Sequence, residues 1–211
     1  MGESLIEERG SWNSWLYNFS VFKVPAHDLL CQRLEEGRRA AVNALPVRPG
    51  LRTLEVGVGS GLSLQYYPAG IKVTGIDPNA TMLEQAKKRA RHAAADVTLE
   101  QMRGEDLKFP DASFDAAVMV NVLSVADDPQ KLLEEAQRVT RPKGSLIVVN
   151  AFHQRNAFLR FARWLLRRKG MIRTFGFHTD LREEDITMSP GWRVTREEDV
   201  KPSRLFVLEK I

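Results

Sequence analysis

Short apolar segments alternate with amphipathic segments along most of the chain. Runs rich in β-branched and apolar residues predict strands near 51–57, 71–77, 96–102, 114–120 and 144–151. Between several of these runs the apolar positions recur at helical spacing instead. Strands that alternate with helices are typical of a parallel sheet with helices on both faces. We therefore predict a doubly wound, Rossmann-like α/β fold.

Two helices are predicted between these strands, at about 79–94 and 129–140. Asn79 stands where the first of them begins. Asp128 and Pro129 begin the second, as a side-chain cap followed by proline in the first helical position. These helix-start signals lie where the spacing of apolar positions changes from that of a strand to that of a helix.

The end of the chain predicts a different element. Two extended stretches in 192–211 are joined around Lys201-Pro202-Ser203, which is typical of a hairpin. Pro142-Lys143-Gly144 predicts the turn into the fifth strand. With the hairpin the sheet has seven strands, mostly parallel, and a helical extension precedes them.

Length and composition fit one domain of 211 residues, of which 43% are hydrophobic. We expect N-terminal helices or a lid at 1–45, a ligand-binding core at 51–151, and an acceptor- or membrane-facing helix with the terminal hairpin at 152–211. No run approaches the length of a membrane span, and we expect no secretory signal. We expect the single cysteine, Cys31, to be a small core residue.

The clearest chemical signal is the string Leu-Glu-Val-Gly-Val-Gly-Ser-Gly at 54–61. Glycines here let the backbone approach a ligand where a Cβ would collide. Asp77 follows the second predicted strand, twenty residues after Gly57, where a carboxylate can accept both hydroxyls of an adenosine ribose. A dinucleotide fingerprint would need glycine at the position of Leu62, so this string does not match that fingerprint.

This string resembles motif I of the class I S-adenosylmethionine-dependent methyltransferases. The resemblance implies S-adenosylmethionine as cofactor and S-adenosylhomocysteine as product. Glu55 suits that cofactor, since an acidic residue complements a sulfonium and an ammonium and repels a phosphate. The expected cofactor-binding residues are Glu55, Gly57, Gly59, Gly61, Asp77, Pro78, Met82, Gly104, Glu105, Asp106 and Asn121, and no metal is expected.

The resemblance covers about 47–151, including the loop at 104–115. In relatives this loop packs on the adenine through backbone amides and an acidic side chain. Arg103 stands where many relatives have that aspartate, so Glu105, Asp106 or backbone groups would take its place, although both carboxylates also suit a solvated turn. Asn121 is expected where cofactor and substrate meet, or as a strand-end cap.

Two aromatic-rich segments lie outside this core. Trp12, Trp15, Leu16, Phe19 and Phe22 recur at helical spacing. The segment 152–177 has seven basic residues and no acidic ones, and along a helix at 156–168 the residues Arg160, Arg163 and Arg167 share one side. A basic amphipathic helix lies on anionic membranes, although such a helix also packs against a sheet.

A narrower resemblance is to the small soluble-type bacterial phosphatidylethanolamine N-methyltransferases. It is carried by 55–64, Tyr-Tyr-Pro at 66–68, 125–129 and 149–153. It implies that Tyr17, on an N-terminal amphipathic helix, lies near the cofactor, with Asn18 in place of the usual Asp. His153, after the fifth strand, is the candidate base, and its alternative is a histidine bonded to backbone.

We expect N-methylation of phosphatidylethanolamine towards phosphatidylcholine, by a monomer at the cytoplasmic face of the inner membrane. The alternatives are a soluble methyltransferase of a small metabolite, thiol or quinone precursor, and a catalytically silent cofactor-binding subunit. A nucleic-acid substrate is not expected. The net charge is only +4, and Asn121-Val122-Leu123-Ser124 replaces the tetrapeptide of the base methyltransferases.

Overall fold

A computed structural model describes residues 35–150 and 182–211. The expectations for Tyr17, His153, Cys31, the aromatic stripe at 12–22 and the basic helix at 156–168 lie outside the described residues. A single domain spanning 1–211 stays a prediction.

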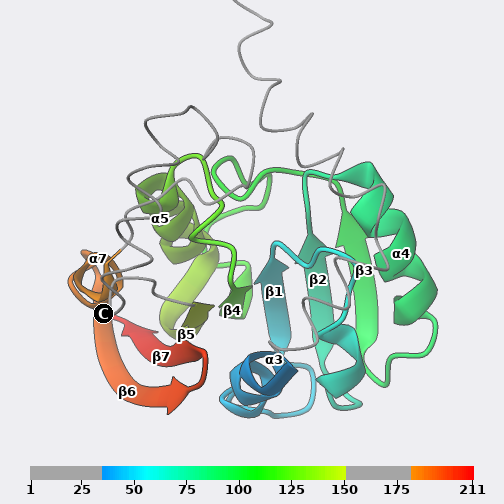
Figure 1. Cartoon of the computed structure of the whole chain (residues 1–211), viewed down its shortest axis with the longest axis horizontal. Coiled ribbons are helices and arrows are strands. Elements are labelled where there is room, and N and C mark those ends of the chain that lie inside the picture. The colour runs from blue at the N-terminus through cyan, green and yellow to red at the C-terminus, as the bar shows by residue number, and fades with distance from the viewer. Residues whose placement is uncertain (1–34, 151–181) are drawn as a thin grey trace, which may run out of the picture.

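The described strands form one seven-stranded sheet in the order β3-β2-β1-β4-β5-β7-β6 (Figure 1). Strands β1 to β5 are parallel, whereas β7 pairs antiparallel with both β5 and β6. The predicted doubly wound, mostly parallel sheet with a terminal hairpin is therefore confirmed. The strands are β1 Arg52–Val56, β2 Lys72–Ile76, β3 Asp96–Glu100, β4 Phe114–Val120, β5 Thr140–Asn150, β6 Trp192–Val200 and β7 Ser203–Lys210.

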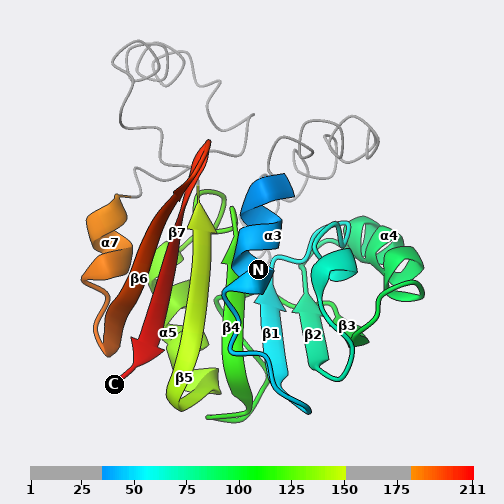
Figure 2. The same cartoon turned by 90° about the horizontal axis from the view of Figure 1, so that it is seen from below.

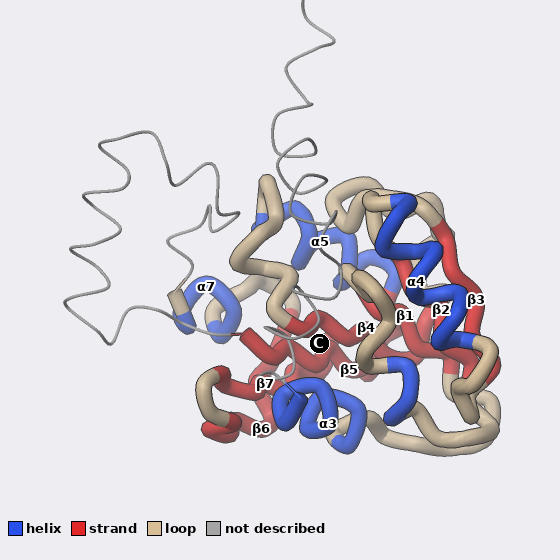
Figure 3. Tube along the Cα trace, turned by 45° about the vertical axis from the view of Figure 1, so that its right-hand side comes forward, coloured by secondary structure: helices blue, strands red, loops and turns tan. Residues whose placement is uncertain are grey.

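Helices cover both faces of this sheet, and Figures 2 and 3 show α3 and α5 on opposite sides. One buried cluster joins apolar side chains of α3 and α4 to the sheet, and a second joins those of α5 and α7 to it. The helical elements are α3 Glu35–Asn43, the short 3₁₀ helix η2 Leu64–Tyr66, α4 Ala80–Ala90, α5 Pro129–Val139 and α7 Glu183–Thr187.

The predicted starts of α4 and α5 are confirmed by their caps. The Asn79 side chain accepts a hydrogen bond from the Met82 N–H at 3.1 Å. The Asp128 side chain accepts one from the Lys131 N–H at 3.0 Å. Each cap satisfies a backbone donor that has no partner within the helix.

The predicted turn at Pro142-Lys143-Gly144 is wrong, because these residues lie within β5. Pairing with β4 shifts register there, from Phe114 opposite Thr140 to Ala116 opposite Ser145. Lys143 has a φ of 59°, so extra residues bulge out of the ladder instead of ending it. Helix α4 also ends four residues earlier than predicted, at Ala90.

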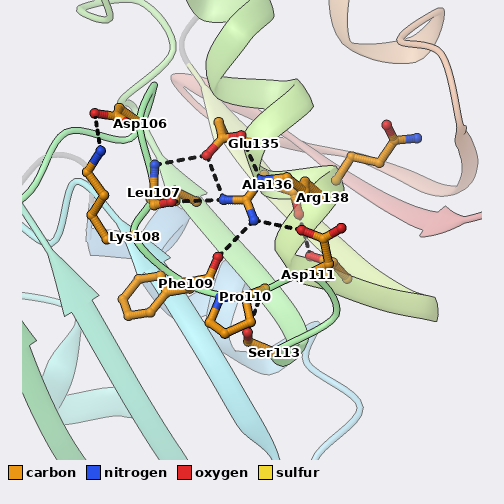
Figure 4. Close-up of polar contacts among 12 residues, drawn as sticks. Asp106, Leu107, Lys108, Phe109, Pro110, Asp111, Ser113, Glu135, Ala136 and Arg138 are labelled. Carbon is orange, nitrogen blue, oxygen red and sulfur yellow. Dashed lines mark hydrogen bonds and ion pairs between the residues drawn. The ribbon is translucent and has the colours of Figure 1, made fainter.

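The segment at 101–113, between β3 and β4, is held to α5 without a helix of its own (Figure 4). Arg138 donates to the carbonyl oxygens of Leu107 and Phe109, each at 2.8 Å. Glu135 pairs with Arg138 at 2.8 Å and accepts from the Leu107 N–H at 2.9 Å. Charge-assisted bonds of this kind are stronger than neutral ones, so this segment has a fixed path over the sheet.

Candidate functional site

The glycine string forms the loop that leaves the carboxyl end of β1. Gly57, Gly59 and Gly61 have φ values of 72°, 54° and 81°, in the left-handed region that favours glycine. A Cβ on Gly57 would lie 2.7 Å from Val122 Cγ2, and one on Gly61 would lie 2.9 Å from the Ala86 Cα. These two glycines therefore let the loop pack closely on its protein neighbours.

Gly59 differs from both of them. A Cβ built on Gly59 would meet no atom of residues 35–150 and 182–211 within 4 Å. Packing against the described part of the chain therefore does not explain this glycine. The space beside it is available to a ligand that needs close contact with the backbone.

Asp77 lies at the end of β2 and holds this loop. Its Oδ2 accepts a hydrogen bond from the Gly59 N–H at 3.0 Å, and its Oδ1 accepts one from the Asn79 N–H at 2.8 Å. The side chain is buried, at 3% exposure. A carboxylate at this edge of the sheet can accept hydrogen bonds from the two hydroxyls of an adenosine ribose.

Glu55 lies on β1 beneath the loop, and it is buried. The Ser63 hydroxyl donates to its Oε1 at 2.5 Å. Burial raises the pKa of the Glu55 carboxyl from 4.5 to about 7, against the lowering effects of Ser63, Tyr67 and Arg38. Its charge near neutral pH therefore depends on its surroundings, instead of being fixed as the sequence suggested.

The sequence analysis missed the three residues that surround Glu55. Ser63 directly precedes η2, Tyr67 follows η2, and Arg38 comes from α3, and all three are buried. Burial and the nearby Glu55 charge raise the pKa of the Tyr67 hydroxyl. A buried carboxyl needs such neighbours, but no sequence spacing identifies which residues supply them.

Met82 and Gly104 shape the site through packing. Met82 is fully buried in the first turn of α4. A Cβ on Gly104 would lie 2.7 Å from Val56 Cγ1 and 3.1 Å from Leu132 Cδ1. Pro78 is exposed, and its carbonyl oxygen accepts from the Gln101 side chain at 3.0 Å.

Glu105 and Asp106, the two carboxylates that the sequence left as alternatives, have different surroundings in the structure. The Glu105 side chain is only 14% exposed, and its Oε1 accepts from the Asp127 N–H at 3.1 Å. The Asp106 side chain is 65% exposed and pairs with Lys108 at 2.6 Å, which lowers the pKa of its carboxyl. Glu105 thus joins the loops at the carboxyl edge of the sheet, whereas Asp106 lies at the solvent surface.

Asn121 lies directly after β4, beside the glycine loop. Its φ of 55° turns the chain, and its N–H donates to the Val149 carbonyl at 2.7 Å. The next residue, Val122, is the neighbour that a Cβ on Gly57 would meet. The loops after β1 and β4 therefore touch, and Asn121 lies close to the glycine loop, while its place between cofactor and substrate stays a prediction.

These features fit S-adenosylmethionine. The open side of Gly59 and the Asp77 carboxylate suit an adenosine ribose, and the carboxyl ends of parallel strands are where open α/β sheets bind ligands. Within 35–150 and 182–211, no cluster of three or more His, Cys, Asp or Glu residues could hold a metal ion. No helix in the same described parts of the chain is long and apolar enough to cross a membrane.

Comparison with known proteins agrees with this fit. Residues 54–148 match the family described as a methyltransferase domain. The chain is 34% identical, over 199 residues, to a phosphatidylethanolamine N-methyltransferase of Cereibacter sphaeroides, and the match covers 93% of this chain and 92% of that protein. It is 40% identical, over 131 residues, to a demethylmenaquinone methyltransferase of Tropheryma whipplei, covering 62% of this chain and 54% of that one.

A solved structure has the same fold. It is a SAM-dependent methyltransferase from Thermotoga maritima, described as a possible histamine N-methyltransferase, with a TM-score of 0.69 and 22% identity. The match covers 93% of this chain and 99% of that one. At this identity the likeness concerns the fold alone.

Gly59→Ala tests whether the open space beside the loop belongs to the cofactor. The described residues leave room for the new methyl group, so the free energy of unfolding should fall by only about 1–2 kcal/mol, the cost of a left-handed alanine. Affinity for S-adenosylhomocysteine, measured by calorimetry, should fall by about tenfold or more, since the methyl group occupies ligand space.

Gly50→Ala is the matched control. Gly50 has a φ of 74° and equally open surroundings, but it precedes β1. It should show a similar loss of stability with unchanged affinity. Equal affinities of the two variants would mean that the cofactor does not approach Gly59.

Glu55 should make stability depend on pH. Because its pKa is raised from 4.5 to about 7, the folded state favours the protonated form. Its stabilising contribution is fully present below about pH 4.5 and is lost as the pH rises through about 7. From about pH 5 to about pH 8, wild type should lose on the order of 2 kcal/mol relative to Glu55→Gln, measured by urea unfolding. If the free energy of unfolding changed with pH in the same way in both proteins, the raised pKa of the buried Glu55 carboxyl would be contradicted.

Proposed function

Because the chain belongs to the S-adenosylmethionine-dependent methyltransferases, we propose that it N-methylates phosphatidylethanolamine and its methylated intermediates towards phosphatidylcholine. The observation that carries this proposal is the extent of one match. The phosphatidylethanolamine N-methyltransferase of Cereibacter sphaeroides is similar along 93% of the chain. The methyltransferase family alone matches only 54–148.

The length of the match to this relative supports its kind of methyl acceptor. Residues 54–148 contain the glycine loop, Asp77 and the strands that hold them, which any acceptor would require. Recognition of the acceptor is expected from the segments before and after this core. A relative that is similar over these segments too therefore supports its own kind of acceptor more than a relative matched over the core.

The cofactor supplies an electrophilic methyl group on a positively charged sulfur, and the protein has to position and deprotonate the amine. An ammonium has no lone pair, so the lipid amine must lose a proton before its nitrogen can bond the methyl carbon. We assign this proton to His153, and we assign orientation of the amine to Tyr17. When bound, the cofactor would supply the methyl carbon to the deprotonated nitrogen, and its sulfur would keep the electron pair of the broken sulfur–carbon bond.

Access to the lipid is assigned to the basic segment. The sequence spacing of Arg160, Arg163 and Arg167 would place them on one side of a helix, as expected for contact with anionic headgroups. The protein would act as a monomer, peripherally bound to the cytoplasmic face of the inner membrane. No nucleic-acid partner is proposed.

A second candidate is methylation of a quinone precursor, a thiol or another small metabolite. It is supported by the higher identity, 40%, to the demethylmenaquinone methyltransferase of Tropheryma whipplei. The chain spans only 54% of that relative's length. The two candidates share the cofactor and differ in the acceptor.

Transfer of label to lipid separates the candidates. The protein is incubated with cofactor labelled on its methyl group and with a total lipid extract, and the products are resolved by chromatography. Label should accumulate in mono-, di- and trimethylated phosphatidylethanolamine, and Asp77→Ala should abolish it. Label in a quinone or in the aqueous fraction would establish the second candidate. Intact cofactor binding without any transfer would indicate a catalytically silent subunit.

Binding to anionic vesicles tests the membrane assignment. Flotation at low salt should recover the wild type with vesicles, and high salt should release it, since each basic residue near the surface contributes about 1 kcal/mol. Changing Arg160, Arg163 and Arg167 to Glu should release the protein without changing cofactor affinity. The matched control changes three exposed arginines elsewhere to Glu, namely Arg39, Arg193 and Arg196. Wild type that stays free of vesicles at low salt would overturn the assignment.

A further inference from the structure

Three charged side chains connect two loops at the carboxyl edge of the sheet. Arg103 Nη2 lies 2.5 Å from Asp127 Oδ2 and 3.5 Å from Glu105 Oε1. The same Glu105 oxygen accepts from the Asp127 N–H at 3.1 Å. We call this closed set the ionic bridge (Arg103, Glu105 and Asp127). Since Arg103 and Glu105 follow β3 whereas Asp127 follows β4, the bridge crosses from one loop to the other.

The position of the bridge ties it to the glycine loop. Gly104, between its first two members, packs so closely that a Cβ would lie 2.7 Å from Val56 Cγ1. Val56 is the last residue of β1, directly before Gly57. The bridge therefore stands beside the point where the glycine loop begins, at the edge of the sheet where the fold binds ligands.

The other end of the bridge is equally fixed. Asp127 directly precedes Asp128, the cap of α5. On the same helix Leu132 Cδ1 would lie 3.1 Å from a Cβ on Gly104. Both loops are thus held against the first turn of α5, one through Asp128 and the other through the packing of Gly104 on Leu132.

The ionic bridge is expected to contribute little to the free energy of unfolding of the whole protein. The Arg103 side chain is 51% exposed and that of Asp127 is 44% exposed. Ion pairs this exposed add little to the free energy of unfolding. A local effect is larger, since loops fixed before a ligand arrives need not lose conformational freedom on binding.

We propose that the ionic bridge positions the loops after β3 and β4 as one wall of the cofactor site, and that Arg103 is its positioning residue. The guanidinium suits this role because its planar group of donors can engage Glu105 and Asp127 at the same time, whereas a lysine offers one point charge. Asp127 in turn raises the pKa of Arg103, so the arginine stays charged. The proposal concerns binding of the family's cofactor, and it does not depend on which acceptor is methylated.

The test measures calorimetric affinity for S-adenosylhomocysteine, with no acceptor present, in full-length protein. Arg103→Gln and Asp127→Asn should each weaken binding by about fivefold to tenfold. Their melting temperatures should stay within about 3 °C of wild type, as expected for loss of an exposed pair. The charge-exchanged double variant R103D/D127R should recover most of the affinity, because it restores opposite charges across the two loops.

Hydrogen exchange and salt supply independent readouts. The Asp127 amide, which donates to Glu105, should exchange faster in Arg103→Gln than in wild type. At about 1 M salt the wild-type affinity should approach that of Arg103→Gln, since the Debye length falls to about 3 Å. The affinity of the variant itself should change little.

The control is Arg193→Gln, which breaks an exposed ion pair with Glu209 at 3.2 Å in the terminal hairpin. It should leave affinity and amide exchange at Asp127 unchanged. Affinity within twofold of wild type in Arg103→Gln would overturn the proposal. So would a charge-exchanged variant that folds and yet binds no better than Arg103→Gln. Neither result depends on which acceptor is methylated.

Discussion

The hydrogen bond between the Gly59 N–H and the Asp77 carboxylate is the interaction on which the site depends. It joins the loop after β1 to the end of β2, and so places an anionic group against a backbone that carries no side chain. The second oxygen of Asp77 holds the Asn79 N–H, at the start of α4. One buried carboxylate thus fixes the loop, the neighbouring strand and the next helix together, and the cofactor is expected to bind in this frame.

Much of this frame could be predicted from sequence because its signals are local. Glycines at 57, 59 and 61, followed by Asp77 at the end of the next apolar run, specify a loop and a carboxylate at one sheet edge. The five parallel strands and the terminal hairpin follow from period and turn residues in the same way. The bulge around Lys143 was missed, because it depends on register with β4 and not on the local sequence.

The surroundings of the carboxylates could not be predicted, since burial is a property of the folded chain. The sequence predicts that Glu55 is always ionised, yet burial raises the pKa of its carboxyl to about 7. Glu105 and Asp106 are adjacent and chemically alike, but one is largely buried within the ionic bridge and the other pairs with Lys108 in solvent. Tyr17 lies outside the described residues, so its role stays a prediction from the family resemblance.

Asp77 is expected to bind the cofactor's ribose while it holds the glycine loop. Titration of Asp77→Ala with S-adenosylhomocysteine by calorimetry tests this most directly, with circular dichroism to verify the fold. We expect a loss of affinity on the order of 100-fold, since two hydrogen bonds to a charged acceptor disappear. Wild-type affinity in a folded Asp77→Ala protein would contradict it.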